Sequence, residues 1–283
     1  MRRQARIEKP RSILLLRVVL ALIGLENGAR GDGSFSSRGE WGEDRFRMVR
    51  IRYDSVGGNG EAYYYYEGRL WQRWETDFPR AELNFLHRLA ELTSLMTDPE
   101  PLSLSLTDPR LLSHPFIFMS DVGWQRLGKE EQRALRAYLE QGGFLWVDDF
   151  WGDAEWENLV TMSQAAFPDW TWRALPPDHA LLRMVYPLKQ CPQVPARLFY
   201  ESTGLPFDPP WMHRQPNGGE ADLSQVHLRG LFDSRGRMVA VATHNTDIAD
   251  GWEREGEDEE YFMKFSVHTY ALGINILVFA MTH

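Results

Sequence analysis

The chain has 283 residues, of which 43% are hydrophobic and 25% are charged, and its formal net charge is −9. This composition is that of an ordinary globular protein and excludes a disordered or collagen-like chain. The single cysteine, Cys191, excludes an intrachain disulfide and a cysteine-based zinc finger. The acidic body of the chain argues against nucleic acid as a main partner, because phosphate binding needs a surplus of Lys and Arg on one face.

The segment that opens the chain has the opposite charge. Residues 1–17 hold six basic side chains and one acidic one, a net charge of +5, and the apolar run 18–25 follows them. This pattern is typical of a secretory signal, so we expect a signal peptide at 1–25 and export to the periplasm or cell envelope. The run is too short for a stable membrane span. The alternative is a cytoplasmic protein, because no A-x-A cleavage pattern follows the run.

Residues 26–45 are rich in Gly, Ser and charged side chains, which predicts a flexible linker. We expect a single α/β domain over 46–283. It begins with an alternating, half-buried strand at 47–53, in which Val49, Ile51 and Tyr53 are predicted to be buried and Arg50 and Arg52 to lie on the opposite, exposed face. Tyrosines at 63–66, with Trp71 and Trp74, are typical of a stacking platform for a sugar or base, or of a flap that covers the core.

The next segments predict a βαβ unit. A helix is expected from Pro79, a short alternating strand at 102–106, and a strand at 116–119 that is apolar on both faces, as in the centre of a parallel sheet. The clearest helix covers 127–143, and the buried strand 144–147 follows it. Strands and a helix joined by short connections indicate a parallel sheet.

The remaining half is less regular. It contains a predicted helix at 155–166, a Pro-rich stretch at 168–225 with one strand at 197–200, and a β-hairpin of 226–232 and 237–243. The last apolar stretch, 262–281, contains polar residues, and these favour a helix packed on the sheet over a membrane span.

Ligands of open α/β sheets bind beyond the carboxyl ends of the strands. This rule selects Asp54, Ser120 with Asp121, Asp148 with Asp149, and the segment 244–253. Asp148 and Asp149 either hold a metal or share a proton, or one of them caps the next helix.

The segment 244–253 spaces His244, Asp247, Asp250 and Glu253 three residues apart, which on a helical turn would bring them to one side. Together with Asp148 or Asp149 they could hold a divalent cation; the alternative is a turn network. His179 is either a general base or metal ligand, or a residue that anchors its loop.

Several segments carry a family resemblance: 50–53, 142–149, the pair Asp178-His179, 244–253, and 273–275 with 280–283. In these segments the chain resembles the bacterial domain of unknown function family 4159 (DUF4159), which is assigned to the class I glutamine amidotransferase-like fold. The resemblance implies a flavodoxin-like three-layer αβα architecture with a mainly parallel sheet and a late hairpin. It implies no activity, because the family has no established reaction.

Amidotransferases of this fold place a cysteine nucleophile on a sharp turn directly after the strand that follows the central helix. This chain has Asp148-Asp149-Phe150 at that position, and Cys191 lies far from it in sequence. Glutamine hydrolysis through a thioester is therefore not expected. A serine hydrolase is not supported either, because the sequence contains no G-x-S-x-G motif.

Two functions remain open. The first is a non-catalytic domain that binds a protein or small molecule in a cleft around Asp148, Asp149, His179 and 247–253. The second is a metal-assisted, hydrolase-like enzyme, in which Asp149 or Glu253 is the general base and Trp252 walls the site; Asp247 and Asp250 would then hold the metal or orient a water.

Overall fold

The computed structural model describes residues 45–57, 62–213 and 222–283. The signal peptide predicted at 1–25, and all but the last residue of the linker predicted at 26–45, lie outside the described residues.

Seven strands form one sheet, in the order β5 (Leu102–Ser105), β1 (Val49–Arg52), β6 (Phe116–Ser120), β8 (Phe144–Asp148), β11 (Met238–His244), β10 (His227–Phe232) and β9 (Thr171–Ala174). The first five are parallel, and β10 runs antiparallel to both of its neighbours. In chain order the parallel strands are arranged 2-1-3-4-5, which is the order of flavodoxin-like sheets. The predicted α/β class with a mainly parallel sheet is confirmed, and so is the late hairpin.

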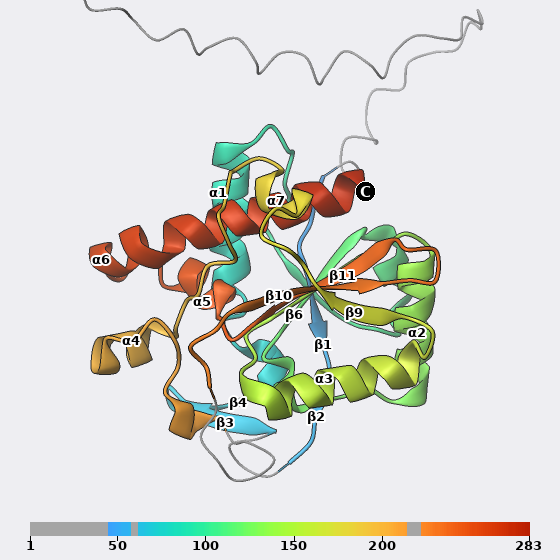
Figure 1. The fold of residues 1–283 in the computed structure, drawn as a ribbon, viewed down its shortest axis with the longest axis horizontal. Coiled ribbons are helices and arrows are strands. Elements are labelled where there is room, and N and C mark those ends of the chain that lie inside the picture. The colour runs from blue at the N-terminus through green and yellow to red at the C-terminus, as the bar shows by residue number, and fades with distance from the viewer. Residues whose placement is uncertain (1–44, 58–61, 214–221) are drawn as a thin grey trace, which may run out of the picture. The chain divides into compact units, whose positions relative to one another are not determined.

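Helices cover both faces of the sheet (Figure 1). Helices α1 (Arg80–Leu92), α5 (Ile248–Glu253) and α7 (Val267–Thr282) pack together on one face, and α2 (Lys129–Glu140) and α3 (Gly152–Ala166) lie on the other. Because side chains alternate along each strand, the two faces carry separate apolar cores. A sheet covered on both sides explains why the central strands are apolar throughout.

Two smaller sheets lie outside the main one. Strand β2 (Asp54–Ser55) pairs with β7 (Gln125–Arg126), and β3 (Tyr63–Tyr66) forms a hairpin with β4 (Arg69–Gln72). The tyrosine run is therefore one strand of a hairpin. Figure 1 shows this hairpin at the same end of the sheet as helix α4 (Arg197–Thr203).

The predicted exposure of Arg50 is wrong. Its side chain is fully buried and forms an ion pair of 2.6 Å with Glu82 of α1, which is also fully buried. The alternating pattern pointed to a half-exposed strand, but β1 is an inner strand with helices on both faces. A charge at an inward position is retained there because it has a buried partner of opposite charge.

The strand predicted at 197–200 is also wrong, because these residues begin helix α4. Gly204 ends the helix in a left-handed conformation, as is common at helix C-termini. Strand β9 was not predicted at all. It lies at the sheet edge within the stretch interpreted as irregular.

The apolar C-terminal segment forms α6 (Glu259–Tyr261), a π-helical turn (Phe262–Ser266) and α7. Among the described residues, the helical segment Glu259–Thr282 is long and apolar enough to cross a membrane by length and composition, but 61% of its most apolar window is buried. Leu272, Ile274 and Ile276 are fully buried in the core above the sheet. The predicted packing of this segment on the sheet is confirmed.

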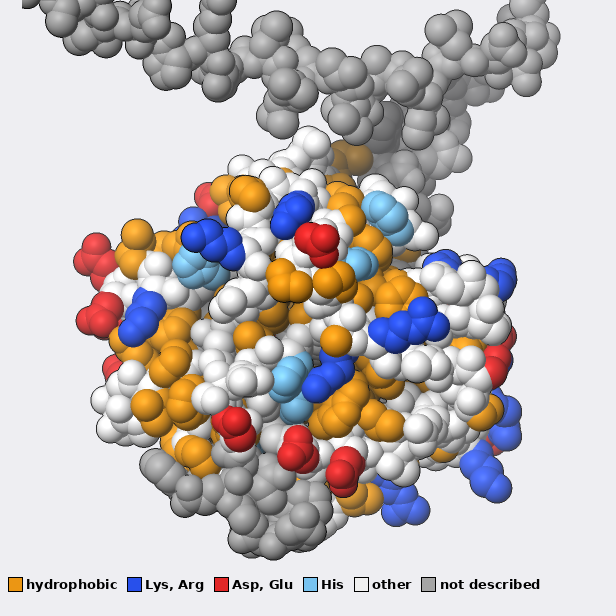
Figure 2. Space-filling model, viewed as in Figure 1, with side chains coloured by type: hydrophobic (Ala, Val, Ile, Leu, Met, Phe, Trp, Pro, Cys, Tyr) orange, Lys and Arg blue, Asp and Glu red, His pale blue; other side chains and the backbone are white. Residues whose placement is uncertain are grey.

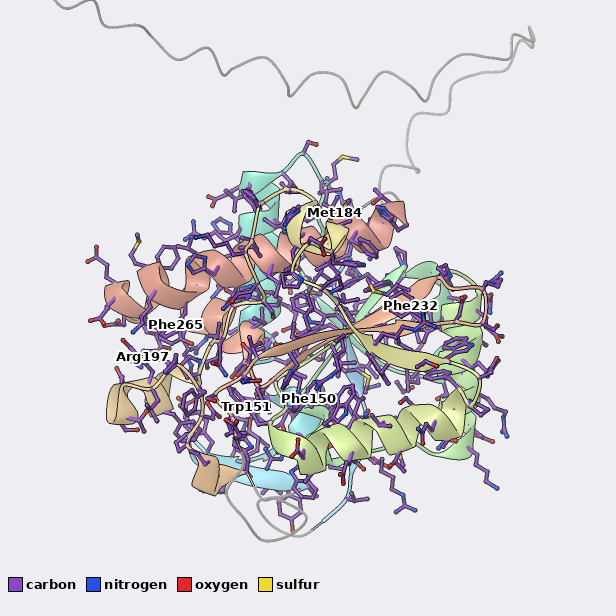
Figure 3. All side chains as sticks on the ribbon, viewed as in Figure 1. Phe150, Trp151, Met184, Arg197, Phe232 and Phe265 are labelled. Atoms are coloured by element: carbon purple, nitrogen blue, oxygen red, sulfur yellow. The ribbon has the colours of Figure 1, made fainter. Side chains whose placement is uncertain are left out.

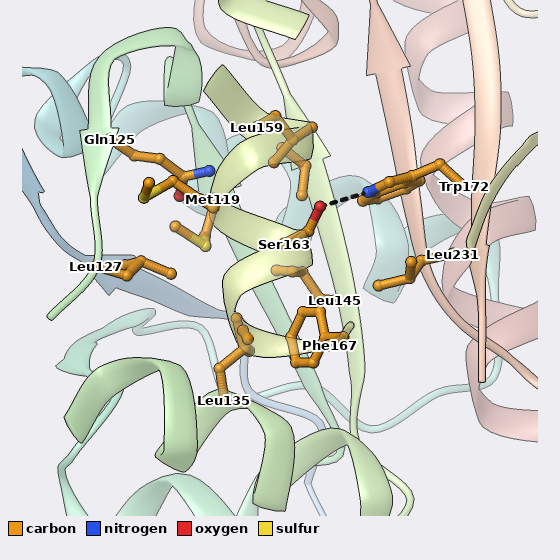
Figure 4. Close-up of a pocket in the computed structure, with 13 residues that line it drawn as sticks. Met119, Gln125, Leu127, Leu135, Leu145, Leu159, Ser163, Phe167, Trp172 and Leu231 are labelled. Carbon is orange, nitrogen blue, oxygen red and sulfur yellow. Dashed lines mark hydrogen bonds between the residues drawn. The ribbon is translucent and has the colours of Figure 1, made fainter. Parts of the chain in front are cut away.

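A cavity of about 20 Å³ lies between the sheet and α3 (Figure 4). Its lining is mostly apolar, and Trp172 donates to Ser163 at its edge with an N to O distance of 3.0 Å. The volume is enough for about one water molecule. This cavity is a small packing defect of the core and is too small for a ligand.

Candidate functional site

The parallel strands end in residues with unusual backbone conformations. Asp121 follows β6, Asp149 follows β8 and Asn245 follows β11, and each has a positive φ, of 55°, 53° and 60°. Asp and Asn adopt this left-handed conformation more readily than other side chains except Gly. The chain therefore turns sharply at the carboxyl end of three neighbouring strands, where ligands of such sheets bind.

A cleft of about 550 Å³ opens at this edge. It lies between the β3–β4 hairpin and the segment that contains α4, and its volume is typical of small-molecule sites. Its lining includes seven carboxylates: Asp77, Asp121, Asp149, Glu155, Asp208, Asp247 and Asp250. The space-filling view shows hydrophobic side chains gathered over α4 and the turn after it (Figure 2), and two residues of the lining there, Leu198 and Met212, are 50% and 52% exposed.

Three of these carboxylates come from separate parts of the chain and converge. One oxygen each of Asp77, Asp149 and Asp247 lies within 4.8 Å of the others, and we call this group the acid triad. Asp77 precedes α1, Asp149 follows β8, and Asp247 caps α5. Among the described residues, no Lys, Arg or His side chain forms an ion pair with any of the three.

The electrostatics of the acid triad favour its neutral form when no cation is present. Burial raises the pKa of Asp77, Asp149 and Asp247 well above the usual range, and the neighbouring carboxylates raise each pKa further. A bound cation would remove this repulsion.

The acid triad also has oxygens free to act as ligands. Asp149 accepts a hydrogen bond from the indole of Trp151 at 3.1 Å, and Asp247 accepts one from the backbone N–H of Asp250 at 2.8 Å. Asp77 Oδ2 is buried without a hydrogen-bond partner. Buried acceptors without a donor are rare in proteins, so this oxygen is available to a ligand or to a water molecule.

A second acidic group shares Asp77 and adds Asp250 and Glu253. This group is already neutralised in part, because Arg254 pairs with Glu253 at 2.7 Å and with Asp250 at 3.5 Å. Asp250 also accepts hydrogen bonds from Tyr261 and from the backbone of Arg197. A metal would have to compete with these donors, so the acid triad is the better cation site.

Arg50 holds Asp77 in place. Besides its ion pair with Glu82, its guanidinium donates to the carbonyl oxygens of Trp74 at 3.1 Å and Thr76 at 2.7 Å. These hydrogen bonds fix the turn directly before Asp77. A side chain of the sheet core therefore positions one carboxylate of the acid triad.

Asp121 joins β6 to the hairpin side of the cleft. Its Oδ2 forms an ion pair with Arg73 at 2.8 Å and accepts a hydrogen bond from Thr76 at 3.0 Å. Burial raises the pKa of Asp121, whereas the adjacent Arg73 opposes that shift. The carboxylate of Asp121 therefore supports the wall of the cleft, and its charge is already paired with the guanidinium of Arg73.

His213 links two carboxylates, those of Glu155 and Asp208, on the opposite wall of the cleft. Its ring lies 3.1 Å from Glu155 and 3.4 Å from Asp208, and it stacks on Trp151 with the ring centres 5.6 Å apart. Burial alone would lower the pKa of His213, but hydrogen bonds to Asp208 and Glu155 outweigh it and raise the pKa to about 10. The imidazole is therefore charged at neutral pH. Figure 3 shows Trp151 and Arg197 on the α4 side of the sheet.

The structure separates the residues selected from the sequence into two groups. Asp121, Asp149, Asp247 and Asp250 line the cleft, and Glu253 lies beside Asp250 in the second acidic group. The others are outside the cleft lining: Asp54 in β2, Ser120 at the end of β6, Asp148, His179, His244 and Trp252.

Asp148 and Trp252 have structural roles outside the cleft. Asp148 is fully buried and accepts hydrogen bonds from Thr243 and from the backbone of Ala249, and burial raises its pKa to about 7. Trp252 stacks on Phe85 in the core, with the ring centres 4.4 Å apart, and does not wall the site.

The two histidines lie elsewhere. His244 faces the α3 side, stacked on Phe150; its Nε2–H donates to the carbonyl oxygen of Gly152, and its Nδ1 accepts a hydrogen bond from Arg229. Burial lowers its pKa to about 3, so it is neutral. His179 accepts a hydrogen bond from the backbone of Leu181 and anchors its turn.

Sequence reasoning missed Asp77, Asp208 and His213. The β3–β4 hairpin lies between β1 and Asp77 in the sequence, so Asp77 was not among the residues that directly follow a predicted strand. One signal was present: Asp77 precedes the predicted helix at Pro79, and a helix that follows a strand begins at the carboxyl edge of the sheet. Asp208 and His213 lie in the Pro-rich stretch, where no periodicity marks them.

The model of a family described as a domain of unknown function (DUF4159) matches residues 61–281. No curated protein matches the sequence.

Proposed function

We propose that this chain, which belongs to the DUF4159 family, is a ligand-binding domain that holds a divalent metal cation in the acid triad of its cleft. The observation that carries the proposal is the convergence of Asp77, Asp149 and Asp247 without a cationic partner among the described residues. Carboxylate oxygens are the preferred ligands of Ca²⁺ and Mg²⁺, and Mn²⁺ binds similar sets. A cation would satisfy Asp77 Oδ2 and remove the repulsion among the three carboxylates.

Calorimetric titration of the full chain with Ca²⁺, Mg²⁺ and Mn²⁺ tests this proposal. We expect one site for at least one of these cations, and its affinity should fall at least about tenfold in Asp149→Asn or Asp247→Asn, since each removes a charged ligand. Asp178→Asn is the matched control, because Asp178 is exposed and outside the cleft. If none of the three cations binds, or if the control loses as much affinity as the triad variants, the proposal fails.

A metal-assisted hydrolase is the second candidate. The observation that favours it is Glu253, because burial raises its pKa to about 7 and it shares a carboxylate cluster with Asp77. A carboxylate that titrates near neutral pH is suited to act as a general base toward a metal-bound water. Cation-dependent hydrolysis of p-nitrophenyl esters that is lost in Glu253→Gln, with cation affinity retained, would favour the enzyme over the binding domain.

The class I glutamine amidotransferase-like fold is also part of our proposal. It is supported by the 2-1-3-4-5 order of the parallel strands and by the sharp turn at Asp149, where such enzymes carry their nucleophile. Cys191 is not a residue of this turn, and burial together with the charge of Asp148 raises the pKa of its thiol, so a thiolate mechanism is not supported.

We propose further that the protein is exported to the periplasm or cell envelope, on the strength of the basic and apolar segments within residues 1–25. Fractionation of the producing bacterium tests this. Recovery of a shortened chain outside the cytoplasm is expected, whereas a full-length cytoplasmic chain would support the alternative.

A further inference from the structure

We propose that the cation-loaded cleft binds a neutral polyhydroxylated molecule, a sugar, whose ring lies against Tyr66 and Trp124 while its hydroxyl groups donate to the carboxylates. This inference rests on the proposed cation site. It adds the chemical class of the ligand, which we infer from three features of the lining. Its Arg and His side chains are already paired with carboxylates, it holds more hydrogen-bond acceptors than donors, and some of its aromatic rings have no ring or cation partner among the described residues.

The cationic side chains of the described lining residues all form ion pairs with carboxylates of the protein. Every Arg and His among the described lining residues has a carboxylate within ion-pair distance: Arg73 with Asp121, Arg197 with Glu201, His213 with Glu155, and Arg254 with Glu253. A phosphate or carboxylate ligand would have to displace one of these acids. The lining therefore disfavours an anionic ligand, except through the metal itself.

The lining offers acceptors in excess. Ionised carboxylates accept hydrogen bonds and donate none, so a complementary ligand must supply donors. Ammonium and hydroxyl groups are the two common donors of small molecules. A divalent cation in the acid triad would repel an ammonium group at close range, which leaves hydroxyl groups as the better match.

Three aromatic rings among the described lining residues are open: Phe199 on α4 and, outside that helix, Tyr66 and Trp124. Tyr64 and Tyr66 share one face of β3, but Tyr64 is covered by Arg73 and by Trp71, and Trp151 is covered by His213. Tyr66 and Trp124 have no ring or cation partner among the described residues. A sugar ring presents C–H groups on one face and hydroxyl groups at its edge, so it can use an aromatic surface and an acidic floor together.

Saturation-transfer NMR and calorimetry on the full chain, with the tightest-binding cation present, test the inference. The probes are glucose, galactose, mannose and N-acetylglucosamine, each at about 20 mM because single sugars often bind in the millimolar range. Inorganic phosphate and spermidine are the anionic and cationic comparisons. We expect at least one sugar to bind and neither comparison ligand to displace it.

The matched variants are Tyr66→Ala, Trp124→Ala and the control Tyr65→Ala, since Tyr65 is 71% exposed and lies on the other face of β3. Tyr66→Ala or Trp124→Ala should weaken sugar binding by about tenfold and leave cation affinity unchanged, which also shows that the variants are folded. Tyr65→Ala should change neither.

The failures of the two proposals are distinguishable. If a cation binds to the acid triad but no sugar binds, or if Tyr66→Ala and Trp124→Ala both bind sugar as tightly as the unchanged protein, the sugar inference is overturned and the cation site stands. Preferential binding of phosphate or spermidine to the loaded cleft overturns it as well. If no cation binds, the proposed function itself is overturned.

Discussion

The guanidinium of Arg50 donates a hydrogen bond of 2.7 Å to the carbonyl oxygen of Thr76, the residue before Asp77. Arg50 belongs to a central strand and Asp77 to the cleft, so the bond links the buried core of the sheet to the candidate cation site. Both Arg50 and its partner Glu82 are fully buried, and each depends on the other for its charge to be tolerated.

We predict that Arg50→Met destabilises the protein by about 3–5 kcal/mol, because it leaves the carboxylate of Glu82 buried without a partner. The double variant Arg50→Met, Glu82→Leu should recover most of this stability but bind the cation more weakly, since the turn before Asp77 is no longer held. Urea unfolding and calorimetry measure the two effects. Equal stability of the single and double variants would contradict the predicted burial of this pair.

Stability should depend on pH through Asp148. Burial raises its folded pKa to about 7, above the value of about 3.9 for an unfolded Asp, so the folded state binds the proton more tightly. The stabilising contribution is complete below the unfolded pKa and is lost as the pH rises from about 4 to about 7. Asp148→Asn should reduce the difference between the unfolding free energies at pH 5 and pH 8, measured by urea unfolding, by about 3 kcal/mol. An unchanged difference would mean that Asp148 is ionised throughout.

Cation binding should release protons. The pKa of each carboxylate in the acid triad is raised, so without a cation the group retains protons that the metal must displace. We expect cation affinity to increase at least about tenfold between pH 5.5 and 7.5, and the measured binding enthalpy to vary with the ionisation enthalpy of the buffer. An affinity that is independent of pH would argue against these three carboxylates as ligands.

His213 should hold the α4 wall of the cleft. Replacing it by Ala leaves Glu155 and Asp208 facing each other without the charged imidazole, which should cost about 1–3 kcal/mol. Hydrogen exchange should become faster in residues 197–212 and stay unchanged in α7. The matched control is His87→Ala, because His87 is 66% exposed in its side chain and pairs only with an exposed Glu91. Exchange that accelerates equally in α7 would indicate global rather than local loosening.

The sequence predicts much of this fold, because its signals are local. The apolar strands at 116–119 and 144–147 and the helix between them follow from periodicity, and Asp149 follows from its place after a buried strand. Asp247 and Asp250 were selected by the same strand-end rule. Helix α4 was missed because it is short and contains no fully buried residue, and its first residue is held by a hydrogen bond from its backbone N–H to the distant Asp250.

The composition of the site was less predictable, because it depends on contacts between distant segments. Asp77 reaches the acid triad through the turn that Arg50 holds, and a charged residue inside a strand was interpreted as an exposed one. Trp252 and His244 were selected for their chemical type and their spacing. In the structure Trp252 packs on Phe85 and His244 on Phe150, so neither side chain lines the cleft. The spacing of residues along the sequence does not predict these orientations.

The cation site is tested most directly by anomalous diffraction from crystals of the full chain soaked in Mn²⁺. We expect an anomalous peak about 2.0–2.6 Å from one carboxylate oxygen each of Asp77, Asp149 and Asp247, and its loss in crystals of Asp149→Asn. A cleft without such a peak, in crystals that carry Mn²⁺ at other carboxylates, would contradict the proposed cation site.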